Sequence, residues 1–183
     1  SVGEADHTRT MMKKLGDVAF WRIAMRPGRP MAVGRIAATG IQAKTGSSAH
    51  PASASSYQND INTSTGGAVL FGLPGNPVAV MVTFLAYVRP ALLRMMGSTR
   101  TAPPLLRATS TEAIRKKPGR TEYQRGTVTT GPDGSLQVRT TGNQGSGVLS
   151  SMVQANGLIV LHHQQGNVAV GDAVDVMVFE GVI

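Results

Sequence analysis

Apolar and polar positions in the first part of the chain alternate over short distances and predict short elements. Residues 6–16 have one apolar side, which predicts a short helix that Asp6 caps. Apolar runs over 18–25 and 31–36 predict two strands. The sequence RPGRP at 26–30 separates them, because two prolines and a glycine break a regular element.

The middle of the chain contains the strongest helix pattern. Residues 67–73 form an apolar run that is short enough for a buried strand. Residues 78–96, which follow a PGNP turn, are apolar on nearly every face and predict a buried helix. Asn76 is suited to cap this helix and Pro77 to occupy its first position. Pro90 is expected to kink it, because proline lacks the N–H that the helix needs.

The segment between these two regions has a different composition. Nineteen of the thirty residues from 37 to 66 are Ala, Ser, Thr or Gly, and large apolar residues are scarce. Such a segment buries too little surface to offset the entropy lost on ordering. We therefore predict a long flexible surface loop at 37–66.

The last part of the chain changes to short strands and turns. Residues 98–104 read as a linker, and a GPDG turn joins predicted strands at 127–130 and 136–141. A further strand is predicted at 158–161, and 168–179 predicts two more, split at a Gly-Asp pair. This spacing is typical of a small barrel. The expected fold is an α/β part over 1–97, followed by an all-β barrel domain over 98–183.

Composition narrows the class of partner. The net charge is +8, which implies an anionic ligand. Eight aromatic residues among 183 are few for nucleic-acid stacking, so a small phosphorylated or oxyanionic ligand fits better. The absence of cysteine excludes disulfides and thiolate metal sites. Since no apolar run reaches 18 residues without a charge and no secretory signal is evident, we expect a cytoplasmic protein with no membrane helix.

Three features are candidates for chemistry. The strand, PGNP turn and capped helix can form an anion site from exposed N–H groups, although it can equally be a plain connection. Arg22, Arg26 and Arg29 place three guanidinium groups on or beside a stiff loop, suited to an oxyanion but also typical of a solvated basic turn. Glu4 and Asp6 are suited to bind Mg²⁺, with helix capping as the alternative role of Asp6. The adjacent histidines at 162–163 are interpreted as a structural or surface pair.

Five motifs occur in an order that resembles the MoeA/gephyrin E-domain family of molybdopterin molybdenumtransferases. They are SVGEAD at 1–6, FWRIAMRPGRP at 20–30, FGLPGNP at 71–77, PGRTEYQR at 118–125 and TGNQGS at 141–146. The resemblance covers nearly the whole chain except 37–66. It implies that 1–97 is the C-terminal half of a molybdopterin-binding α/β domain and that 98–183 is the family's last, β-barrel domain.

The resemblance also implies a reaction and its residues. The family takes adenylylated molybdopterin and molybdate, cleaves the adenylyl phosphoanhydride with Mg²⁺, releases AMP and leaves molybdenum on the dithiolene. The implied catalytic residue is Asp6, which with Glu4 would also bind the metal. The implied ligand-binding positions are Arg22, Arg26, Arg29, Arg120 and Ser146 for molybdate or phosphate, and Gly3, Pro74, Gly75, Asn76 and Pro77 for molybdopterin.

The resemblance implies a homodimer for the parent protein, with a molybdopterin adenylyltransferase as upstream partner. The chain starts without Met at residues that match the middle of the family's third domain. We therefore expect a piece of the transferase that is inactive by itself. The alternatives are a non-catalytic molybdopterin- or anion-binding scaffold module and the related adenylyltransferase, although the latter lacks an attached barrel.

Overall fold

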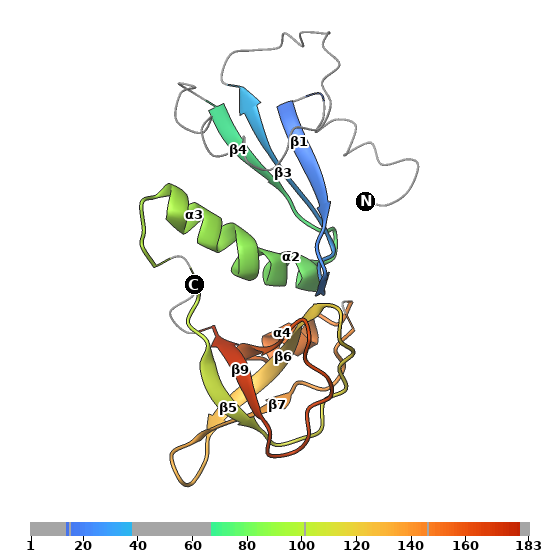
Figure 1. Cartoon of the computed structure of the whole chain (residues 1–183), viewed down its shortest axis with the longest axis vertical. Coiled ribbons are helices and arrows are strands. Elements are labelled where there is room, and N and C mark those ends of the chain that lie inside the picture. The colour runs from blue at the N-terminus through green and yellow to red at the C-terminus, as the bar shows by residue number, and fades with distance from the viewer. Residues whose placement is uncertain (1–13, 15, 38–66, 101, 146, 180–183) are drawn as a thin grey trace. The chain divides into compact units, whose positions relative to one another are not determined.

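The computed structural model describes residues 14, 16–37, 67–100, 102–145 and 147–179 (Figure 1). The chain divides into two compact units. The first takes its described residues from Ser1–Trp21 and Ala32–Gly72, and the second from Arg22–Met31 and Leu73–Ile183. The predicted domain boundary after residue 97 lies inside the second unit and stays a prediction. The predicted helix at 6–16 and the predicted loop at 37–66 lie almost wholly outside the described residues.

The first unit is a three-stranded sheet with the order β1-β3-β4. The strands are β1 (Gly16–Arg22), β3 (Pro30–Ala37) and β4 (Gly67–Gly72). β3 and β4 run antiparallel, with Ala32 opposite Gly72 and Ala37 opposite Gly67. Strands were predicted at all three places, and the first ends earlier than predicted because Met25 belongs to a separate short strand.

The prediction that 67–73 is a buried strand is wrong in its burial. β4 is exposed in its first half and half-buried in its second, and Val69 keeps 41% of its surface. Among the described strands, β4 pairs on one side only. An apolar run indicates that its side chains favour burial, but it does not show whether another element packs over them.

A continuous helix from Pro77 to Met95 opens the main part of the second unit. It consists of α2 (Pro77–Thr83), the π-helical segment η3 (Phe84–Val88) and α3 (Arg89–Met95). As predicted, Asn76 caps the start: its Oδ1 accepts the N–H of Ala79 at 3.2 Å. The helix ends at Met95 with Met96 as its C-cap, and two reversed hydrogen bonds just beyond it, Gly97 N to Arg94 O and Ser98 N to Leu93 O, form a Schellman motif.

The π-helical segment explains how the helix passes Pro90. A proline removes one backbone donor, and its ring clashes with the carbonyl four residues earlier in a regular α-helix. Here the N–H of Arg89 bonds to Phe84 O, five residues back, so the turn before Pro90 is wider. The predicted disturbance at Pro90 therefore takes the form of a π turn, and the helix continues beyond it.

The prediction that this helix is buried on nearly every face is wrong. Val78, Val82 and Leu85 are buried, whereas Phe84 and Met95 are exposed. By length and composition the helix could cross a membrane, so the sequence argument against any such helix was too strict. One third of its most apolar stretch is buried in the fold, and core helices of soluble proteins pass the same test.

The remainder of the second unit is a closed five-stranded barrel, which confirms the predicted barrel (Figure 1). Its strands follow the order β6-β7-β5-β9-β8, and the β6–β8 pairing closes it. They are β5 (Leu106–Ser110), β6 (Thr121–Thr130), β7 (Leu136–Thr140), β8 (Gly157–Leu161) and β9 (Ala173–Val178), with a short helix α4 (Ser150–Val153) before β8.

The region 168–179 holds one strand rather than the two predicted. β9 covers Ala173–Val178, and Val168 only forms an isolated bridge with Ile114. The intervening turn explains this, because Asp172 Oδ2 accepts the N–H of Ala169 at 2.8 Å and Gly171 has a φ of 88°. The turn thus uses a backbone donor that a second strand would need. The predicted GPDG turn is confirmed by a bond from Gly134 N to Gly131 O at 3.0 Å.

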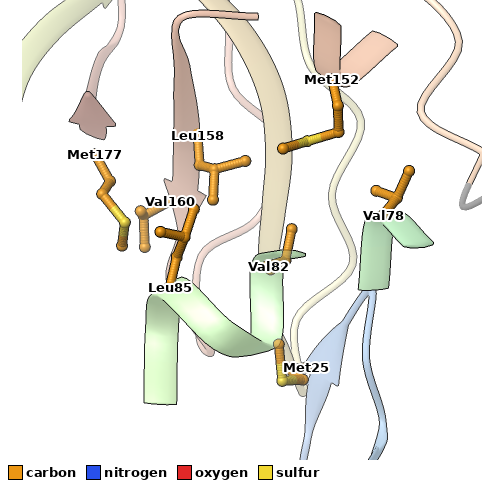
Figure 2. Packing of buried hydrophobic residues seen from close by; sticks show 8 residues of the cluster. All are labelled: Met25, Val78, Val82, Leu85, Met152, Leu158, Val160 and Met177. Carbon is orange, nitrogen blue, oxygen red and sulfur yellow. The ribbon is translucent and has the colours of Figure 1, made fainter. Parts of the chain in front are cut away.

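Strand β8 explains how helix and barrel are joined, because all five of its residues are buried. Leu158 and Val160 face a cluster that includes Val78, Val82 and Leu85 of the helix (Figure 2). The alternate residues of β8, Ile159 and Leu161, belong to a second cluster with residues of β5, β7 and β9. Successive side chains of a strand point to opposite faces, so β8 packs against the barrel interior with one face and against the helix with the other.

Candidate functional site

The segment that carries the predicted arginine cluster is anchored at its centre. Met25, fully buried, belongs to the same cluster as the helix residues (Figure 2). Met25 and Arg26 form the short strand β2, which runs parallel to β6 with Arg26 opposite Glu122. The N–H of Ile23 bonds to Arg29 O at 2.9 Å and closes the loop. The loop therefore has a defined place on the barrel.

Gly28 is required by this placement. Its φ is 105°, and a Cβ added there would lie 2.4 Å from Thr83 Oγ1. Thr83 is fully buried in α2, and within the described part of the chain its hydroxyl has no hydrogen-bond partner. The arginine loop thus lies directly against the helix, at a distance that only a glycine permits.

Replacing Gly28 with alanine is expected to lower the free energy of unfolding by about 2–3 kcal/mol, from backbone strain together with the clash. Denaturant unfolding measures this. Gly119→Ala is a matched control, because Gly119 has a φ of 97° but open space where its Cβ would lie. It should lose only about 1 kcal/mol. Equal losses in the two variants would show that the contact with Thr83 does not matter.

Arg125 of β6 is a second guanidinium group near this loop, and it is 1% exposed. Its Nε donates to Ser151 Oγ at 2.9 Å, and its Nη2 donates to the carbonyl oxygens of Asn143 and Gly145 at 3.2 and 3.0 Å. These partners are all neutral, and no described carboxylate forms an ion pair with Arg125. Burial and, secondly, the charge of Arg26 lower its pKa. A buried cation without a counter-charge is unusual.

Arg120, the arginine that the sequence singled out in this motif, has a different environment. Its Nε lies 2.8 Å from Glu122 Oε1, and the Glu122 residue is 4% exposed. Gln124 Nε2 donates to the other carboxylate oxygen at 3.3 Å. Arg120 therefore compensates a buried acid. Its predicted role in oxyanion binding stays a prediction.

Two hollows adjoin these arginines. The smaller, of about 30 Å³, is lined by Arg26, Arg125 and five neighbours: Pro27, Glu122, Tyr123, Gln124 and Gln144. A water-sized atom needs about 10–15 Å³ of such space, so this hollow admits a few oxygen atoms. The larger, of about 690 Å³, shares Arg26, Glu122, Gln124 and Gln144 with the smaller one and extends along the 112–120 segment. The structure thus brings Arg26, Arg120 and Arg125 to adjoining spaces.

The other predicted site residues lie elsewhere or outside the described residues. Arg22 and Arg29 are exposed and line neither hollow. Gly3, Glu4, Asp6 and Ser146 lie outside the described residues, although Gly145, next to Ser146, accepts a bond from Arg125.

The predicted pterin-binding turn, Pro74 to Pro77, forms the start of the helix and lines neither hollow. Asn76 is engaged as the helix cap. A Cβ at Gly75 would meet nothing within 4 Å, so the backbone there is open to a close neighbour. Close approach of a ligand at this turn is therefore sterically open, and the predicted role of the four residues stays a prediction.

Sequence reasoning missed Arg125, although it lies in a motif that was recognised. The available signal was an arginine in the middle of a strand-like run, TEYQRGTVTT, followed by glycine. A charged residue at a buried position of a strand needs either a partner or a function. The sequence did not reveal which of the two charged residues, Glu122 or Arg125, lacks a partner.

The described residues offer no metal centre, since no group of three or more His, Cys, Asp or Glu side chains could hold an ion. The predicted pair Glu4 and Asp6 lies outside them. The histidines at 162 and 163 are exposed, as expected of a surface pair. His162 Nε2 lies 2.6 Å from Asp175 Oδ2, and Arg107 lies 2.8 Å from Oδ1. Arg107, followed by His162, lowers the pKa of Asp175.

Comparison with known proteins covers both parts of the chain. Residues 1–94 match a family described as the probable molybdopterin binding domain, and residues 107–179 match the MoeA C-terminal region, domain IV. The chain is 33% identical over its whole length to a molybdopterin molybdenumtransferase of Haemophilus influenzae, and spans 38% of that protein. It is 28% identical over 95% of its length to gephyrin of Dictyostelium discoideum, of which it spans 23%.

Solved structures show the same fold. A molybdopterin biosynthesis MoeA protein from Pyrococcus horikoshii OT3 matches 97% of the chain with a TM-score of 0.61 and 19% identity, and the chain covers 39% of it. A molybdenum cofactor biosynthesis protein from Pyrococcus furiosus matches 96% with a TM-score of 0.60 and 22% identity, and 55% of it is covered. The chain is therefore much shorter than its relatives, and its two consecutive family matches together with the shared fold show that it belongs to the MoeA/gephyrin family.

Proposed function

We propose that the chain forms the oxyanion-binding side of a molybdopterin molybdenumtransferase active site, and that molybdate binds between Arg26 and Arg125. The family match and the names of the relatives support a role in molybdenum cofactor biosynthesis. The observation that carries the proposal is the buried guanidinium of Arg125, which has only neutral partners and faces a hollow that it shares with Arg26.

The physical basis is charge compensation. Molybdate is a dianion, and two guanidinium groups without a bound acid would hold it through charge-assisted hydrogen bonds. The same charge that destabilises Arg125 when no anion is present would strengthen its bond to one, because Arg125 is buried and its surroundings screen charge weakly. Arg26, which also lines the hollow, is exposed and so can adjust to the size of the anion. The pair is thus suited to a small tetrahedral oxyanion.

The finer reaction is assigned to the longer parent protein. There, adenylylated molybdopterin would bind at Gly3 and the Pro74–Pro77 turn, with Arg22, Arg29, Arg120 and Ser146 as further anion contacts. Mg²⁺ on Glu4 and Asp6 would neutralise phosphate charge while the phosphoanhydride is cleaved and AMP is released. We further propose a cytoplasmic homodimer supplied by a molybdopterin adenylyltransferase. The chain spans 38% of its Haemophilus relative, so we expect no turnover from it alone.

Calorimetric titration of molybdate and, separately, tungstate into the 183-residue chain tests the oxyanion site. Both are expected to bind one per chain with a dissociation constant of about a millimolar, since two charge-assisted contacts contribute about 3–6 kcal/mol and about 4 kcal/mol corresponds to 1 mM. Perchlorate, a weakly accepting monoanion, is the control for general attraction to a basic protein. No heat of binding at millimolar molybdate would contradict a formed site.

A further inference from the structure

The larger hollow beside the Arg26–Arg125 pair has its own set of cations. Arg115, Lys117 and Arg120 come from the 115–120 segment, and Arg26 closes the side shared with the smaller hollow. With Lys116 included, five cationic and two acidic residues line the hollow, so the net charge of its lining is +3. Its volume of about 690 Å³ lies within the range of small-molecule sites.

The segment that supplies these cations is held firmly in place. Lys116 is 4% exposed, and its Nζ donates to the carbonyl oxygens of Lys117 and Gln165 at 2.8 and 3.0 Å. Its backbone N–H donates to Asn167 Oδ1 at 2.9 Å, and the N–H of Gly119 donates to His163 O at 2.8 Å. The buried lysine thus fixes the backbone of the 115–120 segment, and this pre-organised backbone carries the exposed side chains of Arg115 and Lys117. A segment whose backbone is fixed before binding loses less entropy when a ligand binds than a mobile segment does.

The acids of the hollow do not cancel its positive charge. Glu122 is paired with Arg120, and Glu112 Oε1 accepts the backbone N–H of Thr140. Arg115 and Lys117 are exposed, and no described acid forms an ion pair with either. Their charges are therefore available to a ligand.

The lining also indicates the chemical class of the ligand. It contains no aromatic residue, so nothing in it would stack on a nucleobase or a pterin ring. Besides the cations it presents amide groups of Gln124, Gln144 and Asn167. Lysine, arginine and amide donors together suit phosphate oxygens.

From these observations we propose that the larger hollow is a second anion subsite, which receives a phosphate group through Arg115 and Lys117. It adjoins the oxyanion hollow through Arg26, so one ligand with two linked anionic centres would engage both. This inference rests on the proposed function, because it takes the Arg26–Arg125 hollow as the first of the two subsites.

Pyrophosphate, which has two linked phosphoryl groups, is the probe because it can engage both subsites at once, whereas one orthophosphate engages a single subsite and molybdate reports on the first. We expect the chain to bind pyrophosphate about 10-fold more tightly than orthophosphate, because one added charge-assisted contact provides about that gain in affinity. The Arg115→Ala/Lys117→Ala variant should lose this preference, while its molybdate affinity changes less than about 2-fold. Arg94→Ala/Arg100→Ala removes two exposed charges that line neither hollow and should keep the preference.

The outcomes separate the two proposals. Pyrophosphate binding no tighter than orthophosphate, or a preference that survives in Arg115→Ala/Lys117→Ala, would overturn the second subsite. An equal loss in the Arg94→Ala/Arg100→Ala control would do the same, because it would reduce the effect to net charge. Failure of the unaltered chain to bind molybdate would instead contradict the proposed function. Thermal unfolding of each variant verifies that these surface changes leave the fold intact.

Discussion

Replacing Arg125 with methionine is expected to weaken molybdate binding by about 100-fold or more. Two charge-assisted contacts from one guanidinium contribute about 3 kcal/mol or more, and methionine replaces none of them. The stability of the free protein should change far less, by about 1–2 kcal/mol. Three neutral acceptors lose their donor, but a buried charge without a counter-charge is also removed.

Arg120→Met is the matched comparison, in which the loss of stability should exceed that of Arg125→Met. It leaves the nearly buried carboxylate of Glu122 without its cation, a change that costs about 3–5 kcal/mol for a buried pair. Because the side chain of Arg120 is 27% exposed, screening by solvent should keep the cost toward or below the lower end. Denaturant unfolding and molybdate titration of both variants test this. If Arg125→Met retained its molybdate affinity, the assignment of the oxyanion to this residue would be wrong.

Replacing Asp6 with asparagine in the full-length parent is expected to reduce adenylyl cleavage by about 100-fold or more. Removal of one electrostatic contact to the reacting group typically costs 10²–10³ in rate, by analogy with an oxyanion-hole donor. Asparagine is also as good a helix cap as aspartate, so a helix at 6–16 would keep its start. The substitution therefore separates catalysis from capping.

The measurement is release of AMP from adenylylated molybdopterin with molybdate present, with thermal unfolding of the same sample. An unchanged melting temperature with lost cleavage supports a catalytic Asp6, whereas an unchanged melting temperature with unchanged turnover supports a cap alone. Glu4→Gln tests the second carboxylate in the same assay. Normal turnover in Asp6→Asn would refute the role of Asp6 in the reaction.

Local features of the fold followed from the sequence because their causes are local. The cap at Asn76, the end of the helix near residue 96 and the GPDG turn depend on residues within a few positions of each other, and all three are present. The barrel was predictable for a related reason, since short strands with turns at regular spacing have few ways to close. Proline at position 90 predicted a disturbed helix, and its form, a π turn, depends on the adjoining carbonyls.

Burial and pairing of charges were not local, and the sequence could not determine them. An apolar run looks the same whether or not a second layer covers it, so β4 and the helix were predicted to be buried, whereas the first half of β4 and the outer face of the helix are exposed. Arg120 and Arg125 are five residues apart and equally basic in the sequence. Only the barrel shows that Arg120 meets a buried acid while Arg125 meets neutral carbonyls supplied by Asn143 and Gly145.

The sequence by itself determined the family, the order of the elements and the basic character of the site, since these depend on motifs and composition. The tertiary structure decided which cations lack partners, because a charge is compensated by whatever the fold brings within a few ångströms. The loop containing Arg26 lies beside Arg125 only because Met25 is packed in the core and Gly28 fits against Thr83. Those contacts belong to groups of residues some 50 to 150 positions apart, which no local pattern encodes.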